Sequence, residues 1–260
     1  MNMKDYTLVW EENFDYKGLP TTEKWNFEVG NHQWPNKELQ AYTARESNIY
    51  VKNGQLSIYG RKEKDGEREY TSSKINTSKK ASWKYGYFEF KPKMPSGEGS
   101  WPAVWLMPED WSFEKETQNN SENLHAKWPA CGEIDMMEYV GRFPNHILFS
   151  LHCKNHNHAD KSTKPLTTAV QFDFKPADDF HVYGMEWTED YIEYFVDGVS
   201  YCKYNKADDP DQSLDSWPFC KPFYLIVNLA IGGGLGGPVD KTSLPYTFIL
   251  DYIRVYQKTK

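Results

Sequence analysis

Three acidic side chains stand within six residues of an otherwise apolar segment. Residues 132–141 read GEIDMMEYVG, which contains Glu133, Asp135 and Glu138. In a regular strand alternate side chains share a face, so Glu133 and Asp135 point one way and Glu138 the other. One extra residue at the Met-Met pair, a β-bulge, would return Glu138 to the face of the other two acids. The spacing therefore predicts a bulged strand with three carboxyl groups on one face.

The predicted separation of the two glutamates suits a sugar-cleaving pair. With one residue taken up by the bulge, the Cα atoms of Glu133 and Glu138 lie about four strand steps apart, roughly 13 Å. If each side chain leans inward by about 4 Å, the carboxyl groups come within roughly 5 Å. A glycosidase that retains anomeric configuration needs about 5–5.5 Å, whereas an inverting one needs about 6.5–9.5 Å to fit a water. The spacing favours a double displacement with Glu133 as nucleophile and Glu138 as acid/base.

Three acids on one face cannot all be ionised at low cost, because like charges raise at least one pKa. The reaction needs such a division, with one ionised nucleophile and one protonated acid near neutral pH. We assign the ionised state to Glu133 and the proton to Glu138, with Asp135 orienting Glu133. Two other interpretations of the same carboxylates stay open at this point, a metal site and a solvated acidic strand face.

Strand patterns dominate the rest of the chain. Residues 49–60 and 191–204 predict hairpins that turn at an Asn-Gly and an Asp-Gly pair, which adopt the positive φ of tight turns. No stretch longer than about ten residues keeps a 3.6-residue apolar period. The pattern predicts an all-β fold, a sandwich or jelly roll, with one domain over residues 1–260. Further strands are predicted at residues 86–91, 101–107, 133–140, 146–152, 170–174, 180–187, 223–230 and 246–256.

One segment interrupts this rhythm of short strands and turns. Residues 108–130 are polar and irregular, and they lead into the acidic strand. A loop this long in a compact domain is usually functional or disordered.

Charge and composition exclude several classes of partner. The net charge is −7 and no basic stripe follows the chain, which argues against nucleic acid and favours a neutral polymer over a polyanion. No apolar run approaches the roughly 18 residues that span a membrane. The first residues lack the pattern of a secretion signal, so either a signal was trimmed or the protein stays inside the cell. Aromatic residues make up 16% of the chain, which suits a β core or sugar stacking equally.

The four cysteines are not arranged as a metal or redox motif. Cys131, Cys153, Cys202 and Cys220 include no CxxC spacing. An even count permits two disulfides but does not demand them, and we expect free, buried thiols.

At these residues the sequence resembles glycoside hydrolase family 16, and its laminarinase-type members in particular. The family signature is E-[ILV]-D-x-x-E, and EIDMME matches its bulged form. The surrounding WPACGEIDMMEYVG and the earlier GSWPAVWLMPE also look like laminarinases. So do NKELQAYT, WKYGYFEFKPKMP, FHVYGMEWT, KPFYLIVNLAIGG and LDYIRVYQ, in the family's order over nearly the whole chain.

The resemblance implies a fold and an activity. The fold would be a β-jelly roll of two curved antiparallel sheets with an open cleft on the concave face. The activity would be that of an endo-1,3(4)-β-glucanase, which hydrolyses internal β-1,3 bonds, or β-1,4 bonds next to β-1,3 ones, in laminarin-type or mixed-linkage glucans. We expect a monomer that needs no cofactor for catalysis and takes a β-glucan polysaccharide or oligosaccharide. Such a substrate leads us to expect a secreted or cell-surface protein.

The resemblance also implies substrate-binding residues. Trp101 and Trp105 match aromatic positions on the donor side of the family's cleft, and Asn36 matches a polar contact on that side. Trp128 matches an aromatic position near the acceptor side. His152 matches a histidine beside the catalytic carboxylates; alone, it would be interpreted as a core histidine.

Many members of the family bind one calcium ion away from the catalytic residues. Backbone oxygens near the start and at the first hairpin, with a carboxylate on the last strand, supply its ligands. Here those positions are Glu12, Gly54 and Asp251. Oxygen ligands suit Ca²⁺, and we expect a structural ion only.

Two departures from the family pattern argue against a strict β-1,3 preference. Residues 232–237 read GGGLGG, so Leu235 replaces a tryptophan that laminarinases often carry. Lys74 stands where they commonly carry arginine, and lysine cannot reproduce a forked hydrogen-bond pattern.

Alternative functions follow from the same comparison. A glucanase that prefers mixed-linkage glucan over laminarin is one, and the laminarinase-like flanks disfavour a galactan substrate. A non-catalytic glucan-binding lectin on the same scaffold is another, and the presence of all three acids argues against it.

Overall fold

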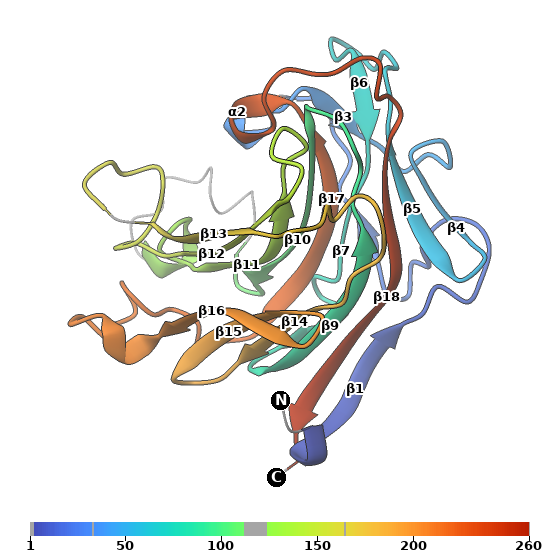
Figure 1. Cartoon of the computed structure of the whole chain (residues 1–260). Helices are drawn as coiled ribbons and strands as arrows, with labels where there is room; N and C mark the ends of the chain where they lie inside the picture. Colours follow the sequence, from blue (N-terminus) through green and yellow to red (C-terminus); the bar gives the residue numbers. More distant parts are fainter. Residues whose placement is uncertain (1–2, 33, 112–123, 164, 260) are drawn as a thin grey trace.

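The computed structural model describes residues 3–32, 34–111, 124–163 and 165–259. The chain forms two large antiparallel sheets that lie one over the other, with a small parallel pair beside them (Figure 1). The predicted all-β jelly roll is confirmed. Among the described residues, no helix has the length and apolar character needed to cross a membrane.

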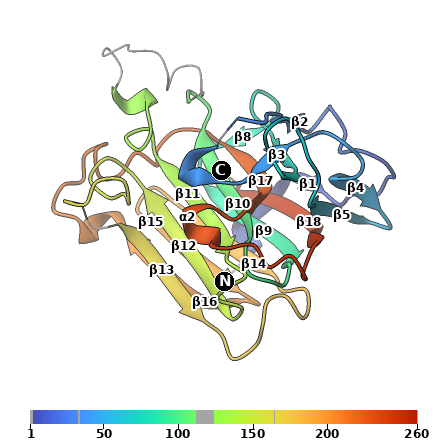
Figure 2. The same cartoon turned by 90° about the horizontal axis from the view of Figure 1, so that it is seen from above.

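One sheet, here called the site sheet, carries the acidic strand near its centre, and its strands β10 to β13 lie side by side in Figures 1 and 2. Its strands in spatial order are β13 (Leu166–Gln171), β12 (His146–His152), β11 (Glu133–Tyr139), β10 (Ser100–Pro108), β17 (Phe223–Ile231), β7 (Lys74–Asn76) and β2 (Asn26–Phe27), and β8 (Ser82–Trp83) also pairs with β17.

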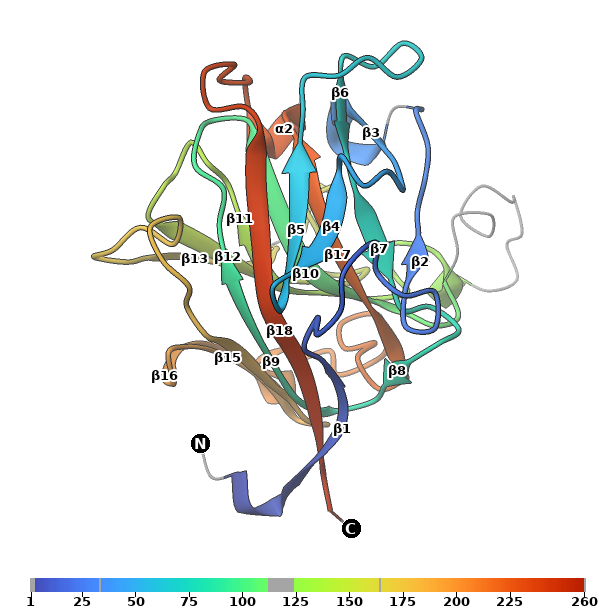
Figure 3. The same cartoon turned by 90° about the vertical axis from the view of Figure 1, so that its right-hand side faces the viewer.

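The other sheet, here called the back sheet, is built around the long strand β18 (Figure 3). Its strands in spatial order are β16 (Val199–Asn205), β15 (Tyr191–Val196), β14 (Tyr183–Trp187), β9 (Gly86–Lys93), β18 (Tyr246–Lys258), β5 (Gln55–Gly60) and β4 (Ile49–Lys52), and β1 (Tyr6–Glu12) also pairs with β18.

The remaining elements are short. The parallel pair is β3 (Gln40–Tyr42) with β6 (Tyr70–Ser72), and the helical turns are η1 (Met3–Asp5), η2 (Pro35–Lys37), η3 (Leu124–Ala126), η4 (Lys206–Asp208) and α2 (Gly233–Gly236).

The first and last strands bring the two ends of the chain together. In the antiparallel pair of β1 and β18, Tyr6 lies opposite Lys258, and Thr259 N donates to Asp5 O at 2.9 Å. Figure 1 shows both ends at the same extremity of the back sheet.

The hairpins form as predicted. β4 and β5 turn at Asn53 and Gly54, which have φ values of 57° and 74°. β15 and β16 turn at Asp197 and Gly198, at 49° and 78°. Most of the other predicted strands are found within two residues of their predicted ends. The strand expected at 170–174 instead covers Leu166–Gln171, because threonines on an edge strand carry little apolar signal.

The core lies between the two sheets. Ile134, Met136, Met137 and Tyr139 of β11 all belong to the main buried cluster, in which both sheets take part. Two adjacent methionines cannot face the same layer in a regular strand. The register explains this, because Asp135 lies opposite residue 150 of β12 and residue 138 lies opposite residue 148, so one residue of β11 is extra. The predicted β-bulge is confirmed.

Candidate active site

The bulge places three carboxyl groups on the outer face of the site sheet. Glu133, Asp135 and Glu138 all point away from the core that takes the residues between them. The partners of Glu133 and Glu138 on β12 are His152 and Leu148. They are four residues apart, roughly 13 Å at about 3.3 Å per residue, so the predicted four-step spacing is confirmed.

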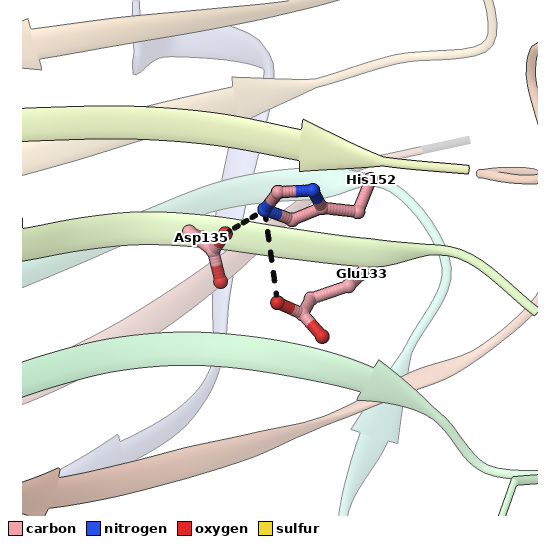
Figure 4. A group of neighbouring side chains, drawn as sticks. All are labelled: Glu133, Asp135 and His152. Atoms are coloured by element: carbon pink, nitrogen blue, oxygen red, sulfur yellow. Dashed lines mark ion pairs between the residues drawn. The ribbon is translucent and has the colours of Figure 1, made fainter. Parts of the chain in front are cut away.

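A histidine stands between two of these acids. Nε2 of His152 lies 3.2 Å from Asp135 Oδ2 and 3.9 Å from Glu133 Oε1. Figure 4 shows the three side chains pointing toward one another from neighbouring strands. The side chains of His152 and Asp135 are only 7% and 5% exposed. His152 therefore lies beside the carboxylates, where the family resemblance predicted a histidine.

Two tryptophans hold the two glutamates. Trp128 Nε1–H donates to Glu133 Oε2 at 2.9 Å, and Trp101 Nε1–H donates to Glu138 Oε1 at 3.0 Å. Each bond engages one oxygen of a carboxyl group. These bonds also hold the indole rings next to the acids.

Burial and mutual repulsion make the acids hard to ionise. Burial, followed by the charge of Asp135, raises the pKa of Glu133 to about 8, while His152 and the Trp128 N–H act in the opposite direction. Burial, and then the charge of Glu138, raises the pKa of Asp135. Burial also raises the pKa of Glu138, against the Trp101 hydrogen bond.

This differs from the expected division of charge. The sequence argument gave Glu133 a negative charge and Glu138 the proton. The predicted repulsion is present, but the pKa of Glu133 is raised to about 8, which favours its protonated form near pH 7. The reason is that the side chain of Glu133 is only 16% exposed and therefore poorly solvated.

The metal interpretation keeps a geometric basis. Donor atoms of Glu133, Asp135 and His152 lie within 4.8 Å of one another. In the part of the chain that the structure describes, no other three His, Cys, Asp or Glu side chains are grouped in this way. The same groups can thus serve acid/base chemistry or accept a cation.

Of the other predicted substrate-binding residues, Trp105 lies beside the acids and Asn36 is more distant along the chain of contacts. Trp105 stands on β10 directly opposite Asp135, and its Nε1–H donates to Asn228 at 2.8 Å. Asn36 is exposed in η2, with φ of 64°, and η2 contacts the short helix α2. It has no described hydrogen bond to the acids. Of the polar segment 108–130, residues 112–123 lie outside the described residues.

Leu235 of α2 lies beside the end of the acidic strand. It packs with Trp101 and Val140, and it lines a hollow of about 230 Å³ whose walls are almost entirely apolar. The other residues that line this hollow are Phe143, His146, Leu148 and Ala169. Leu148 is the strand partner of Glu138, so the hollow adjoins the acid/base position.

The predicted calcium positions come together where β18 changes neighbours. Residue 253 pairs with Glu12 of β1, and residue 250 pairs with residue 56 of β5, two positions after Gly54. Asp251 lies between these two pairings. Its Oδ2 is 3.0 Å from Lys91 Nζ, so a bound cation would compete with an ammonium group. The carboxylate of Glu12 is already occupied by protein donors, which leaves its backbone oxygen as the expected ligand.

All four cysteines are free, as expected; three of them are buried, but Cys220 is exposed, which differs from the expectation.

The sequence argument missed His158. Its ring centroid lies 5.3 Å from that of Trp128 and 5.0 Å from that of His152. Its loop is fastened by the neighbouring His156, which hydrogen-bonds to Asp209. Burial, and then His152, lowers the pKa of His158. A loop histidine carries no strand pattern, so no signal in the sequence pointed to it.

Comparisons with known proteins agree with this fold. The profile of the family "Glycosyl hydrolases family 16" matches residues 36–247. A β-glucanase from Rhodothermus marinus is 42% identical over 97% of this chain and 85% of its own. The structure of the laminarinase from Rhodothermus marinus superposes with a TM-score of 0.87 at 40% identity, over 98% of each chain.

A further solved structure contains an oligosaccharide. It is a variant of SCLam, a non-specific endo-β-1,3(4)-glucanase, co-crystallised with 1,3-β-D-cellotriosyl-glucose. It superposes with a TM-score of 0.86 at 37% identity, covering 98% of this chain and 96% of its own.

Proposed function

The chain belongs to glycosyl hydrolases family 16, and on that premise we propose that it is a retaining endo-β-glucanase that cleaves internal β-1,3 bonds, and β-1,4 bonds next to them, in laminarin-type or mixed-linkage glucans. The names of the related β-glucanase, laminarinase and endo-β-1,3(4)-glucanase support this substrate class. The acidic composition of the chain suits a neutral polymer. We propose that it acts as a monomer. The molar mass measured by size-exclusion chromatography with light scattering tests this.

In the first step, Glu133 attacks the anomeric carbon while Glu138 protonates the departing glycosidic oxygen. The attacking carboxylate must be ionised, and the positive charge that develops on the sugar ring favours that ionisation. The N–H of Trp128 stabilises the ionised form through its bond to Oε2. Because Oε1 of Glu138 accepts the N–H of Trp101, the transferable proton belongs on Oε2.

In the second step, Glu138 takes a proton from water, and the water attacks the glycosyl–enzyme bond and releases Glu133. Asp135 lies two residues from Glu133 on the same face. In this proposal, Asp135 and His152 together set the pKa of Glu133. These groups supply the acid, the base and the nucleophile, so the reaction needs no cofactor.

The observation that carries the proposal is the bulge in β11. Without it, Glu138 would face the core and could not share a substrate with Glu133. The site supports a catalytic pair rather than a solvated acidic face, because Glu133 and Glu138 are partly buried and each accepts an indole N–H.

The test is a product profile on laminarin, lichenan and curdlan, with the anomeric configuration of the first products followed by NMR. We expect oligosaccharide products that first appear in the β configuration. Glu133→Ala should abolish hydrolysis and keep glucan binding, whereas the exposed Glu46→Gln should behave as wild type. A wild type that cleaves none of the three polymers would refute the substrate class, and α-configured first products would refute the mechanism.

A preference for mixed-linkage glucan over laminarin is the second candidate. It is favoured by Lys74, which pairs with Glu28 at 2.9 Å and therefore offers no forked contact to a sugar. The smaller Leu235 points the same way. Relative kcat/KM on barley glucan and laminarin distinguishes the two.

A further inference from the structure

The indole N–H of Trp105 begins a buried chain of hydrogen bonds. It donates to Asn228 Oδ1 at 2.8 Å, and Asn228 Nδ2 donates to the hydroxyl of Tyr42 at 3.0 Å. The Tyr42 hydroxyl donates to Glu38 Oε2 at 3.3 Å. Asn228 and Tyr42 are 7% and 2% exposed. A carboxyl group in a loop is thus connected to a ring on the outer face of the site sheet.

The far end of this series of hydrogen bonds, at Glu38, is anchored to β17, the strand that carries Asn228. Gln40 Nε2 donates to Glu38 Oε2 at 2.6 Å, and the backbone N–H of Ile231 donates to Gln40 Oε1 at 2.8 Å. Gln40 is fully buried, and Ile231 is the last residue of β17. Glu38 is therefore tied to β17 at two points, and its position is fixed relative to the sheet.

A cation holds the face of the same ring. Lys74 Nζ lies 5.1 Å from the ring centroid of Trp105 and 5.3 Å from that of Trp34. Its partner is Glu28, at 2.9 Å, and the lysine side chain is only 10% exposed. An ammonium group this close to an indole face is attracted by the ring quadrupole. Trp105 is thus held at its N–H edge and over its face.

The register places this ring beside the acids. Trp105 is the direct strand partner of Asp135. Two residues earlier, Ala103 pairs with Glu138 on one side and with Asn228 on the other. Neighbouring strands are about 4.8 Å apart, so Asn228 lies about 10 Å across the sheet from Glu138. The hydrogen-bond chain therefore ends at the ring of Trp105, which a polymer lying over the carboxylates would touch.

We propose that Glu38 and Tyr42 are positioning residues for the glucan, which act through Asn228 by holding the ring of Trp105 at a fixed orientation. The proposal rests on the proposed function. An aromatic ring contributes to binding only if it lies flat against the sugar. If the ring of Trp105 is not held in the unbound protein, binding must fix its orientation, and this costs affinity. Loss of the chain should therefore weaken binding while leaving the acid/base pair unchanged.

The experiment is a double-mutant cycle with Tyr42→Phe and Trp105→Phe. Tyr42→Phe removes one hydroxyl and keeps the buried ring. We expect a rise of about five- to tenfold in KM for laminarin, as for the loss of one hydrogen bond, with kcat within twofold of wild type. If the hydroxyl acts through the indole N–H, the double variant should be no worse than Trp105→Phe alone.

Tyr183→Phe is the matched control. Tyr183 is 1% exposed, and its hydroxyl has no hydrogen-bond partner in the described chain. It should leave KM unchanged. Additive effects of Tyr42→Phe and Trp105→Phe, an unchanged KM in Tyr42→Phe, or an equal rise in Tyr183→Phe would each overturn the proposal. A wild type that cleaves no glucan would instead refute the proposed function, so the two failures are distinguishable.

Discussion

Replacing Glu133 by glutamine should stabilise the fold, and the gain should grow with pH. The substitution keeps the shape of the side chain and an acceptor for the Trp128 N–H. It removes a carboxyl group that burial and Asp135 make costly to ionise. The folded protein therefore retains a proton on Glu133 at pH values where the unfolded chain has already lost it.

The magnitude follows from the two pKa values. Folding raises the pKa of Glu133 from 4.5 to about 8. Because the raised value belongs to the folded state, the wild type loses stability as pH rises from about 4.5 through about 8. Each pKa unit corresponds to about 1.4 kcal/mol, so the whole window corresponds to about 5 kcal/mol. Glu133→Gln does not suffer this loss.

Denaturant unfolding at pH 5, 6, 7, 8 and 9 measures the effect and needs no catalytic activity. The difference in unfolding free energy between Glu133→Gln and wild type should rise by about 1.4 kcal/mol per pH unit in the middle of the window. The exposed Glu46→Gln is the control, and its difference from wild type should stay level. A Glu133→Gln difference that is equally level from pH 5 to pH 9 would refute this account of the site.

Three further predictions concern the acid, the indole support and the calcium position. Glu138→Gln should reduce hydrolysis of laminarin about 10²- to 10⁴-fold and spare aryl glycosides with good leaving groups, and an equal loss on both substrates in steady-state assays would contradict the acid role. Trp128→Phe should raise the pKa of Glu133, because the N–H of Trp128 favours the ionised form of that carboxyl group. The acid limb of the pH profile of kcat/KM should therefore move to higher pH, and a limb that stays in place would refute this effect of Trp128. Calcium at 100 times its Kd should stabilise the wild type by about 2.7 kcal/mol, which a higher Tm that EDTA reverses would show. Calcium should have no effect on the Tm of Asp251→Asn, and the same calcium response in both proteins would place the ion elsewhere.

The strand pattern could be predicted because it depends on local chemistry. The Asn53-Gly54 turn needs positive φ angles that few other residue pairs tolerate. The bulge could be predicted because an acid of the wrong parity, Glu138, has no stable place in a core. Edge strands were harder to place, since β13 is rich in threonine and is poorly distinguished from a loop.

The ionisation of the site could not be predicted from sequence. Spacing indicated that the acids repel one another, but the extent to which Glu133 is removed from water depends on how His152 and Trp128 close around it. The hydrogen-bond chain from Glu38 to Trp105 was also missed. It joins residues nearly 190 positions apart, Tyr42 and Asn228, whose contact only the folded sheet creates.

The pairing of β1 with β18 has a practical consequence for protein engineering. Because Tyr6 and Lys258 are antiparallel neighbours, a linker of a few glycine and serine residues would join the start of β1 to the end of β18 with little strain. New ends could then be opened at a hairpin of the back sheet. In such a circular permutant, the sequence around the three carboxylates would stay uninterrupted. The same proximity means that a support or fusion partner attached at either end would hold the enzyme in nearly one orientation.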